Sequence, residues 1–102
     1  MMDRLQFNYE FFGSTTYRLK RTPEEYIKSG RVYFATDPDE ATLPTVAAMI
    51  GEDHLVLGSD YCHPEGMSPY TMRILYERPD VSPTLKRKIL SDSPGRLYRI
   101  AV

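Results

Sequence analysis

The sequence lacks several features that would assign a protein to a class at once. It has one cysteine, Cys62, which excludes an internal disulfide framework and favours a reducing cytoplasm. No run of roughly 18 apolar residues predicts a membrane span, and the first residues lack the apolar core of a signal peptide. The 13 basic and 14 acidic residues give a net charge of −1, which leaves no basic footprint for nucleic acid. We therefore expect a cytoplasmic protein with no nucleic-acid or membrane partner.

Prolines mark the clearest predicted boundaries of secondary structure in the chain. Five of its eight prolines follow a residue that can cap a helix: Thr22-Pro23, Asp37-Pro38, Ser68-Pro69, Ser82-Pro83 and Ser93-Pro94. A cap side chain accepts from the free amides of the first turn, where proline lacks only an amide that has no partner. Glu25 and Glu40 stand three residues after Thr22 and Asp37, as a capping box requires. Each of the five pairs therefore predicts the start of a helix.

Two short segments, residues 32–36 and 54–58, are apolar without alternation, which is typical of strands that are buried on both faces of a parallel sheet. Between them, one apolar stripe at helical spacing is formed by Leu43, Val46, Ala47 and Ile50. Gly51 suits the end of this helix. Pro44 falls either in its first turn or after a short piece that begins at Pro38.

The predicted order is βαβα, an α/β arrangement with neighbouring parallel strands. A chain of 102 residues suits a single domain over residues 1–102. Two strands leave both edges of their sheet unpaired, however. We therefore expect the chain either to be part of a larger α/β protein or to associate with copies of itself.

The segment after the second strand carries chemically active side chains. Gly58 is followed by Ser59, Asp60, Tyr61, Cys62 and His63, with Glu65 two residues further on. A carboxylate just past a buried parallel strand can be held rigidly and still face a cleft, so Asp60 is a candidate for catalysis or metal binding. It could equally be an ordinary turn or capping residue. Cys62 and His63 could join Asp60 around a soft metal or act in nucleophilic catalysis, although a structural thiol explains Cys62 as well.

Several stretches match the pattern of a known family. They are V-Y-F-A-T-D-P-D-E at 32–40, G-S-D-Y-C-H within 50–66, K-I-L-S-D-S-P-G-R-L-Y at 88–98 and K-R-T-P-E-E-Y at 20–26. Together they resemble the amidohydrolase superfamily, and more narrowly its amidohydrolase 2 branch of metal-dependent hydrolases and non-oxidative decarboxylases. The family pattern usually has proline, asparagine and alanine where this chain has Cys62, Ser93 and Gly95.

The resemblance implies a (β/α)8 TIM-type barrel, of which this chain would supply the C-terminal βαβα portion. It also implies that Asp60 is a ligand of a divalent metal, zinc or manganese, and takes a proton during catalysis. His63, Cys62 and Glu65 are expected to contact the substrate or to support the metal ligands. The family's H-x-H pair and the histidines of its middle strands have no counterpart in this sequence. We therefore expect the isolated chain to bind no metal tightly.

The leading hypothesis is that the chain is the C-terminal segment of a metal-dependent hydrolase or decarboxylase, which is a lyase. A missing barrel segment or further copies of the chain would complete its site. The substrate would be a small molecule of the carboxylic acid, amide or ester type. Two alternatives are a non-catalytic truncated remnant and a small self-associating binding module that uses the loop from Asp60 to Glu65.

Overall fold

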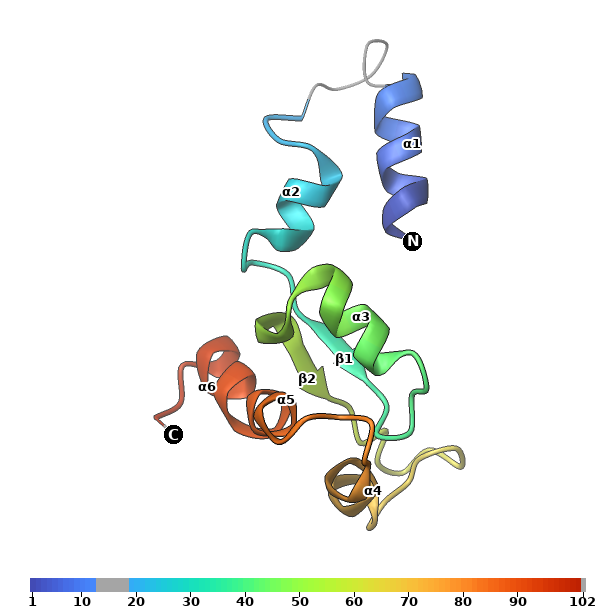
Figure 1. Ribbon diagram of the computed structural model, residues 1–102, viewed down its shortest axis with the longest axis vertical. Coiled ribbons are helices and arrows are strands. Elements are labelled where there is room, and N and C mark those ends of the chain that lie inside the picture. Colours follow the sequence, from blue (N-terminus) through green and yellow to red (C-terminus); the bar gives the residue numbers. More distant parts are fainter. Residues whose placement is uncertain (13–18, 102) are drawn as a thin grey trace. The chain divides into compact units, whose positions relative to one another are not determined.

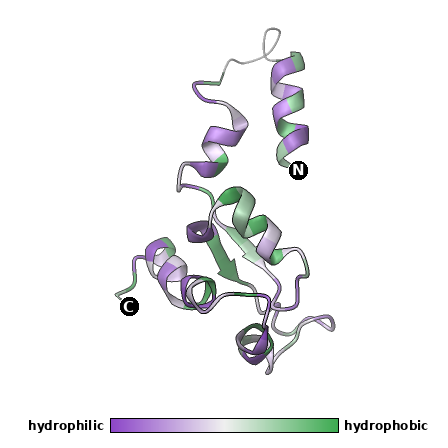
Figure 2. Ribbon diagram, viewed as in Figure 1, coloured by the Kyte–Doolittle hydropathy of each residue, from purple (hydrophilic) through white to green (hydrophobic). Residues whose placement is uncertain are grey.

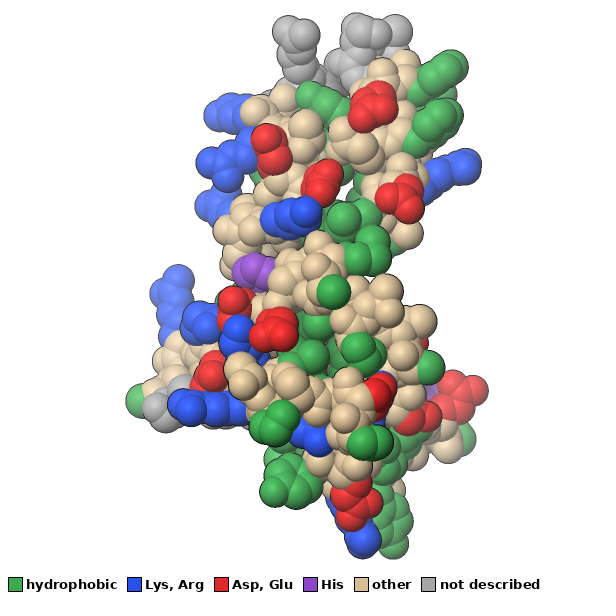
Figure 3. Space-filling model, in the orientation of Figure 1, with side chains coloured by type: hydrophobic (Ala, Val, Ile, Leu, Met, Phe, Trp, Pro, Cys, Tyr) green, Lys and Arg blue, Asp and Glu red, His purple; other side chains and the backbone are tan. Residues whose placement is uncertain are grey.

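The structure is a computed structural model that describes residues 1–12 and 19–101. These residues form two compact units, Met1–Val32 and Tyr33–Val102. In the described part of the chain, no helix is long and apolar enough to cross a membrane. Acidic and basic side chains are interspersed on the visible face of each unit (Figure 3). The single domain over residues 1–102 stays a prediction.

The first unit contains helices α1 (Met2–Phe12) and α2 (Pro23–Lys28) (Figure 1). A complete capping box begins α2: the Thr22 hydroxyl accepts from the Glu25 N–H at 3.2 Å, and the Glu25 carboxylate accepts from the Thr22 N–H at 2.9 Å. This confirms the helix start predicted at Pro23. In α1, the rings of Phe7 and Phe11 stack with their centroids 5.8 Å apart.

The second unit is built on a strand-helix-strand crossover. Strand β1 (Phe34–Thr36) leads through α3 (Leu43–Ile50) and a 3-10 turn, η1 (Glu52–His54), to strand β2 (Leu55–Leu57). The strands pair in parallel, with Phe34 opposite Leu55 and Thr36 opposite Leu57 (Figure 1). The Gly58 N–H extends the ladder by donating to the Thr36 carbonyl at 3.0 Å. The predicted α/β order is therefore observed, with strands of three residues each.

The two faces of this sheet differ in burial. Residues two apart on a strand, and residues paired across a parallel ladder, point to the same side. One side carries Thr36 and Leu55, which are 7% and 1% exposed, and β2 contacts the C-terminal helical segments. The other side carries Ala35, which is exposed, and Val56, which is partly exposed. The prediction of burial on both faces is wrong for Ala35, because no described helix covers it.

The core of the second unit lies between α3, β2 and the C-terminal helices. Its buried apolar side chains are Leu43, Ala47, Ile50, Leu55, Leu75, Val81, Leu85 and Ile89. Figure 2 shows the same concentration of hydrophobic residues in β2 and α3. The predicted stripe of α3 is confirmed except at Val46, which stays partly exposed. Gly51 ends the helix with φ +93°, a conformation that favours glycine.

The described chain after β2 has its helical segments between residues 71 and 98. It forms α4 (Thr71–Glu77), α5 (Pro83–Arg87), a π-helical segment η2 (Lys88–Asp92) and α6 (Ser93–Tyr98). Ser82 caps α5, since its hydroxyl accepts from the Leu85 N–H at 3.1 Å. The start predicted at Pro83 is confirmed. Ser93 does not act as a cap: its hydroxyl donates to the Asp53 carbonyl at 3.2 Å, and η2 runs directly into α6.

At two of the five predicted positions, Pro38 and Pro69, the helix begins later than expected. Residues 38–42 form turns, and the helix begins at Leu43 with Pro44 in its first turn. The Glu40 carboxylate accepts from the Thr42 N–H and hydroxyl, so the capping box predicted with Asp37 is not formed. The peptide before Pro69 is cis, and α4 begins two residues later, at Thr71.

Candidate functional site

Asp60 lies where the parallel pair ends. It follows β2 by three residues, and the bond from Gly58 to Thr36 holds the chain beside β1 until just before it. Its backbone is in the left-handed region at φ 47°, which Asp tolerates better than most residues. Its side chain is 63% exposed. The sequence therefore placed this carboxylate correctly, just beyond the carboxyl end of a parallel strand.

Two consecutive backbone turns shape the loop after Asp60. The His63 N–H donates to the Asp60 carbonyl at 3.1 Å, and the Gly66 N–H donates to the His63 carbonyl at 2.9 Å. A side chain at residue 66 would run into both of these carbonyl groups. Glycine is therefore required for the closure of this loop. Cys62 also takes a left-handed conformation, at φ 73°, and its side chain is exposed.

His63 stands beside Asp60, with Nδ1 at 3.5 Å from a carboxylate oxygen. The same Nδ1 accepts from the Glu65 N–H at 3.3 Å. One nitrogen cannot use its lone pair for the amide and carry a proton toward Asp60 at the same time. The neutral ring, protonated on Nε2, satisfies the bond from Glu65, whereas a ring protonated on Nδ1 would pair with Asp60. The imidazole thus has two alternative partners in the loop.

A hollow of about 80 Å³ opens at the carboxyl ends of the two strands. It is lined by Asp37, Pro38, Gly58, Ser59, Asp60, Glu65, Gly66 and Met67. Of the predicted site residues, Asp60 and Glu65 line it, while Cys62 and His63 lie outside its lining. Among the described residues of the lining, three are acidic and none is basic. The hollow therefore presents only negative side-chain charge.

Asp37 is the lining residue that sequence reasoning missed. The sequence pattern predicts a helix cap at Asp37, although Asp37 comes directly after β1 and Asp60 comes three residues after β2. The carboxyl ends of parallel strands lie at one edge of a sheet, so carboxylates placed after both strands are brought together. That relation was available in the sequence once the two strands were taken as parallel neighbours.

The model of the amidohydrolase family matches residues 6–100 of the chain, including both strands and the loop that carries Asp60. The chain belongs to the amidohydrolase family. The resemblance seen in its motifs, to the amidohydrolase 2 branch of hydrolases and decarboxylases, is thus confirmed. A search among curated proteins gives no match.

Amidohydrolases generally use divalent metals. Asp60 offers an exposed carboxylate, a ligand that divalent cations accept. Within residues 1–12 and 19–101, however, no group of three or more His, Cys, Asp and Glu side chains is placed to hold a metal ion. Catalytic zinc normally has three protein ligands. In this amidohydrolase chain, the Asp60 carboxylate could therefore serve as one ligand of a metal centre. The described residues do not supply the other ligands that a complete centre needs.

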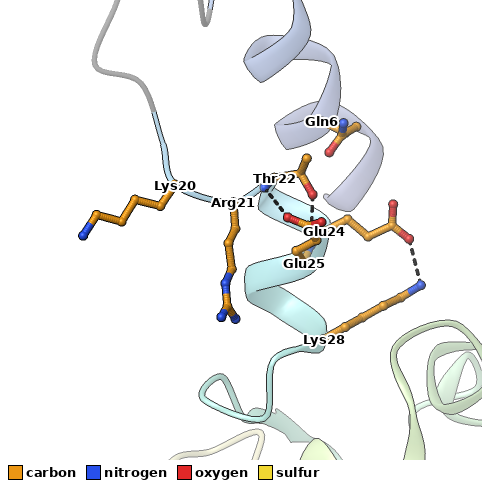
Figure 4. Close-up of a pocket in the computed structure, with 7 residues that line it drawn as sticks. All are labelled: Gln6, Lys20, Arg21, Thr22, Glu24, Glu25 and Lys28. Carbon is orange, nitrogen blue, oxygen red and sulfur yellow. Dashed lines mark hydrogen bonds and ion pairs between the residues drawn. The ribbon is translucent and has the colours of Figure 1, made fainter.

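A larger hollow, of about 780 Å³, lies in the first unit of the amidohydrolase chain (Figure 4). It is lined by Gln6, Lys20, Arg21, Thr22, Glu24, Glu25 and Lys28. Lys28 pairs with Glu24 at 2.7 Å, and Glu25 is engaged in the capping box. None of the predicted site residues lines it, and the bonds of Lys28, Glu24 and Glu25 stabilise the start and the side of α2.

Proposed function

We propose that this chain is the C-terminal βαβα portion of a (β/α)8 barrel in a metal-dependent hydrolase or non-oxidative decarboxylase. Asp60 would be its ligand to a divalent cation, zinc or manganese. The observation that carries the proposal is the position of Asp60 at the mouth of the acidic hollow, beyond a parallel strand, in a chain that matches the amidohydrolase family over residues 6–100. Active sites of barrel enzymes lie at this end of the strands.

The proposed chemistry divides between the cation and the chain. A bound divalent cation would polarise a carbonyl and make water a stronger nucleophile near neutral pH. Asp60 would bind the cation through one carboxylate oxygen and take a proton through the other, since its exposed side chain leaves both oxygens accessible. His63, beside that carboxylate, would orient it, and Glu65 in the lining would contact the substrate. Cys62, which is exposed and outside the lining, would contact the substrate or support the metal ligands.

The remaining ligands would come from another segment of the barrel or from another copy of the chain. The exposed sheet face with Ala35 and Val56 supports this, because the inner faces of barrel strands pack against the other strands. The substrate would be a small carboxylic acid, amide or ester. The cytoplasm is the compartment that the single cysteine favours.

The test is turnover by a barrel that contains this segment together with the histidine ligands. Asp60→Asn nearly preserves volume but removes the charge and the basicity, so we expect kcat to fall by about 10²-fold or more with folding retained. Ser59→Ala, a change at a neighbouring residue of the same lining, should be far milder. Equal losses in the two variants, or full activity of Asp60→Asn, would contradict the assignment of Asp60 as metal ligand and proton acceptor. Either result would favour a binding module or a non-catalytic remnant.

A further inference from the structure

Arg78, directly after α4, joins that helix to the loop that follows β1. Its side chain is 12% exposed. Nη1 donates to the Pro38 carbonyl at 3.1 Å and to the Glu40 carbonyl at 2.8 Å. On its other side, the guanidinium donates to the Asp80 carboxylate, from Nε to Oδ1 at 2.9 Å and from Nη2 to Oδ2 at 2.6 Å. Because the guanidinium is planar and its donors point in fixed directions, these bonds together hold the loop in one place.

The segment that presents Arg78 is itself anchored. The Lys86 ammonium group, on α5, donates to the Tyr76 carbonyl at 2.7 Å and to the Arg78 carbonyl at 2.5 Å. These are carbonyls at the C-terminal end of α4, where a cation is favourable. The guanidinium therefore extends from a base that α5 holds in position.

The loop that Arg78 holds forms one wall of the acidic hollow. Pro38, which accepts from Arg78, lines the hollow, and so does its neighbour Asp37. On the other side of Asp37, the Thr36 carbonyl accepts from Gly58 in the parallel ladder. The backbone of Asp37 is thus fixed between the sheet and Arg78, and Asp37 and Asp60 line the same hollow.

We propose that Arg78 is a positioning residue of the Asp60 site, which keeps the Asp37 carboxylate at the hollow by holding the carbonyls of Pro38 and Glu40. The proposal rests on the proposed function, because it requires a divalent cation to gather at Asp60. The sequence does not predict the contact between Arg78 and the loop after β1, because the two are about forty residues apart and no residue near Arg78 indicates it. If Arg78 only stabilised the fold, its replacement would change the response of Asp37 and Asp60 to the cation to the same extent.

The test uses the full chain with isotope-labelled aspartate and Mn²⁺ as a paramagnetic probe in NMR. Asp37 and Asp60 report on the hollow, and Asp53 in η1, which precedes β2, is the reference in the same spectrum. In the wild-type chain we expect weakly and transiently bound Mn²⁺ to broaden Asp37 and Asp60 together, before Asp53. In Arg78→Lys, which cannot bridge two carbonyls and Asp80, we expect loss of the Asp37 broadening with Asp60 unchanged. Arg78→Gln is a second variant with the same expectation, should the first not fold.

Arg73→Lys is the matched control, because Arg73 lies on the exposed side of α4 and pairs with Glu77 at 2.7 Å. It should leave the broadening of both residues unchanged. Joint broadening of Asp37 and Asp60 in both Arg78 variants would overturn the positioning role and leave the proposed function standing. A wild-type chain in which Asp60 broadens no earlier than Asp53 would overturn the role of Arg78 at a cation site of this chain, whereas the proposed function is decided by turnover of the complete barrel.

Discussion

Backbone conformation at single residues sets the direction of the Asp60 carboxylate. Asp60 and Cys62 both have positive φ, and the two turns from Asp60 to Gly66 close through main-chain hydrogen bonds. The side chains in this loop are exposed, and the contact between Asp60 and His63 is long, at 3.5 Å. The loop geometry is therefore held mainly by its backbone and by the absence of a side chain at Gly66.

Gly66→Ala tests this dependence on the backbone. The added carbon would meet the Asp60 and His63 carbonyls, so the loop must shift, and we expect a loss of roughly 1–3 kcal/mol in the free energy of unfolding. Gly58→Ala is the matched control, since its added carbon would meet Ala35 and Thr36 atoms at 3.8 Å, an ordinary contact. Denaturant unfolding compares the two, and equal stability would show that the loop adapts freely.

At the scale of elements, one sequence signal gave different structures. Ser82-Pro83 begins a capped helix, whereas Ser68-Pro69 precedes α4 without capping it. Asp37-Pro38 enters turns whose carbonyls at Pro38 and Glu40 are taken by Arg78. A cap signal is local, and a distant donor can satisfy the same backbone groups in another conformation.

Ser82→Ala should lower the free energy of unfolding by about 1 kcal/mol, because the Leu85 N–H loses its acceptor. Ser68→Ala removes the same hydroxyl from a residue with the same sequence signal that caps no helix. We expect it to change stability by much less. Thermal unfolding of both variants measures the difference, and similar losses would contradict the assignment of Ser82 as the only cap of this pair.

A charged network joins η1 to the C-terminal helices and predicts acid sensitivity. Lys88 lies 3.2 Å from an Asp53 carboxylate oxygen, and Arg96 donates to the Asp53 carbonyl at 2.8 Å. The hydrogen bond from Lys88, aided by the charges of Lys88 and Arg96, lowers the pKa of Asp53 below its usual value. A lowered folded-state pKa stabilises the fold above the pKa of the unfolded chain, and this stability is lost as the pH falls through the folded-state value.

Asp53→Asn should therefore flatten the loss of thermal stability between about pH 5 and pH 3, because aspartate titrates in this range when unfolded. The effect should be modest, since the Asp53 side chain is 53% exposed and solvent screens the pair. Asp92→Asn is the control, with a longer contact of 3.6 Å to the exposed Arg87. Melting curves that fall equally steeply in wild type and Asp53→Asn would refute the prediction.

At the scale of the whole molecule, the second unit has a covered and an open sheet face. The strands pair only with each other among the described residues, so their outer edges are also unpaired. Exposed edges and apolar faces favour association with another chain. The part of the amidohydrolase fold that the structure describes is therefore expected to be incomplete in isolation.

We expect the isolated chain to form dimers or larger species at micromolar concentration, as measured by light scattering. Val56→Lys places a charge on the open sheet face and should shift the population toward monomer. Met72→Lys is the matched control, because Met72 is an apolar side chain that is 60% exposed on α4 and does not belong to the sheet. A wild-type chain that is monomeric and unfolds cooperatively would contradict this prediction, because it would show that the chain folds stably without a partner.

The sequence by itself determined the strand-helix-strand order, the caps of α2 and α5, the family and the place of Asp60. These features depend on neighbouring residues, since capping, helical periodicity and strand ends are set over a few positions. Only the tertiary structure decided that Ser93 bonds to Asp53 and that Arg78 holds the loop after β1. These depend on packing that brings together groups about forty residues apart, and local sequence signals carry no information about such pairs.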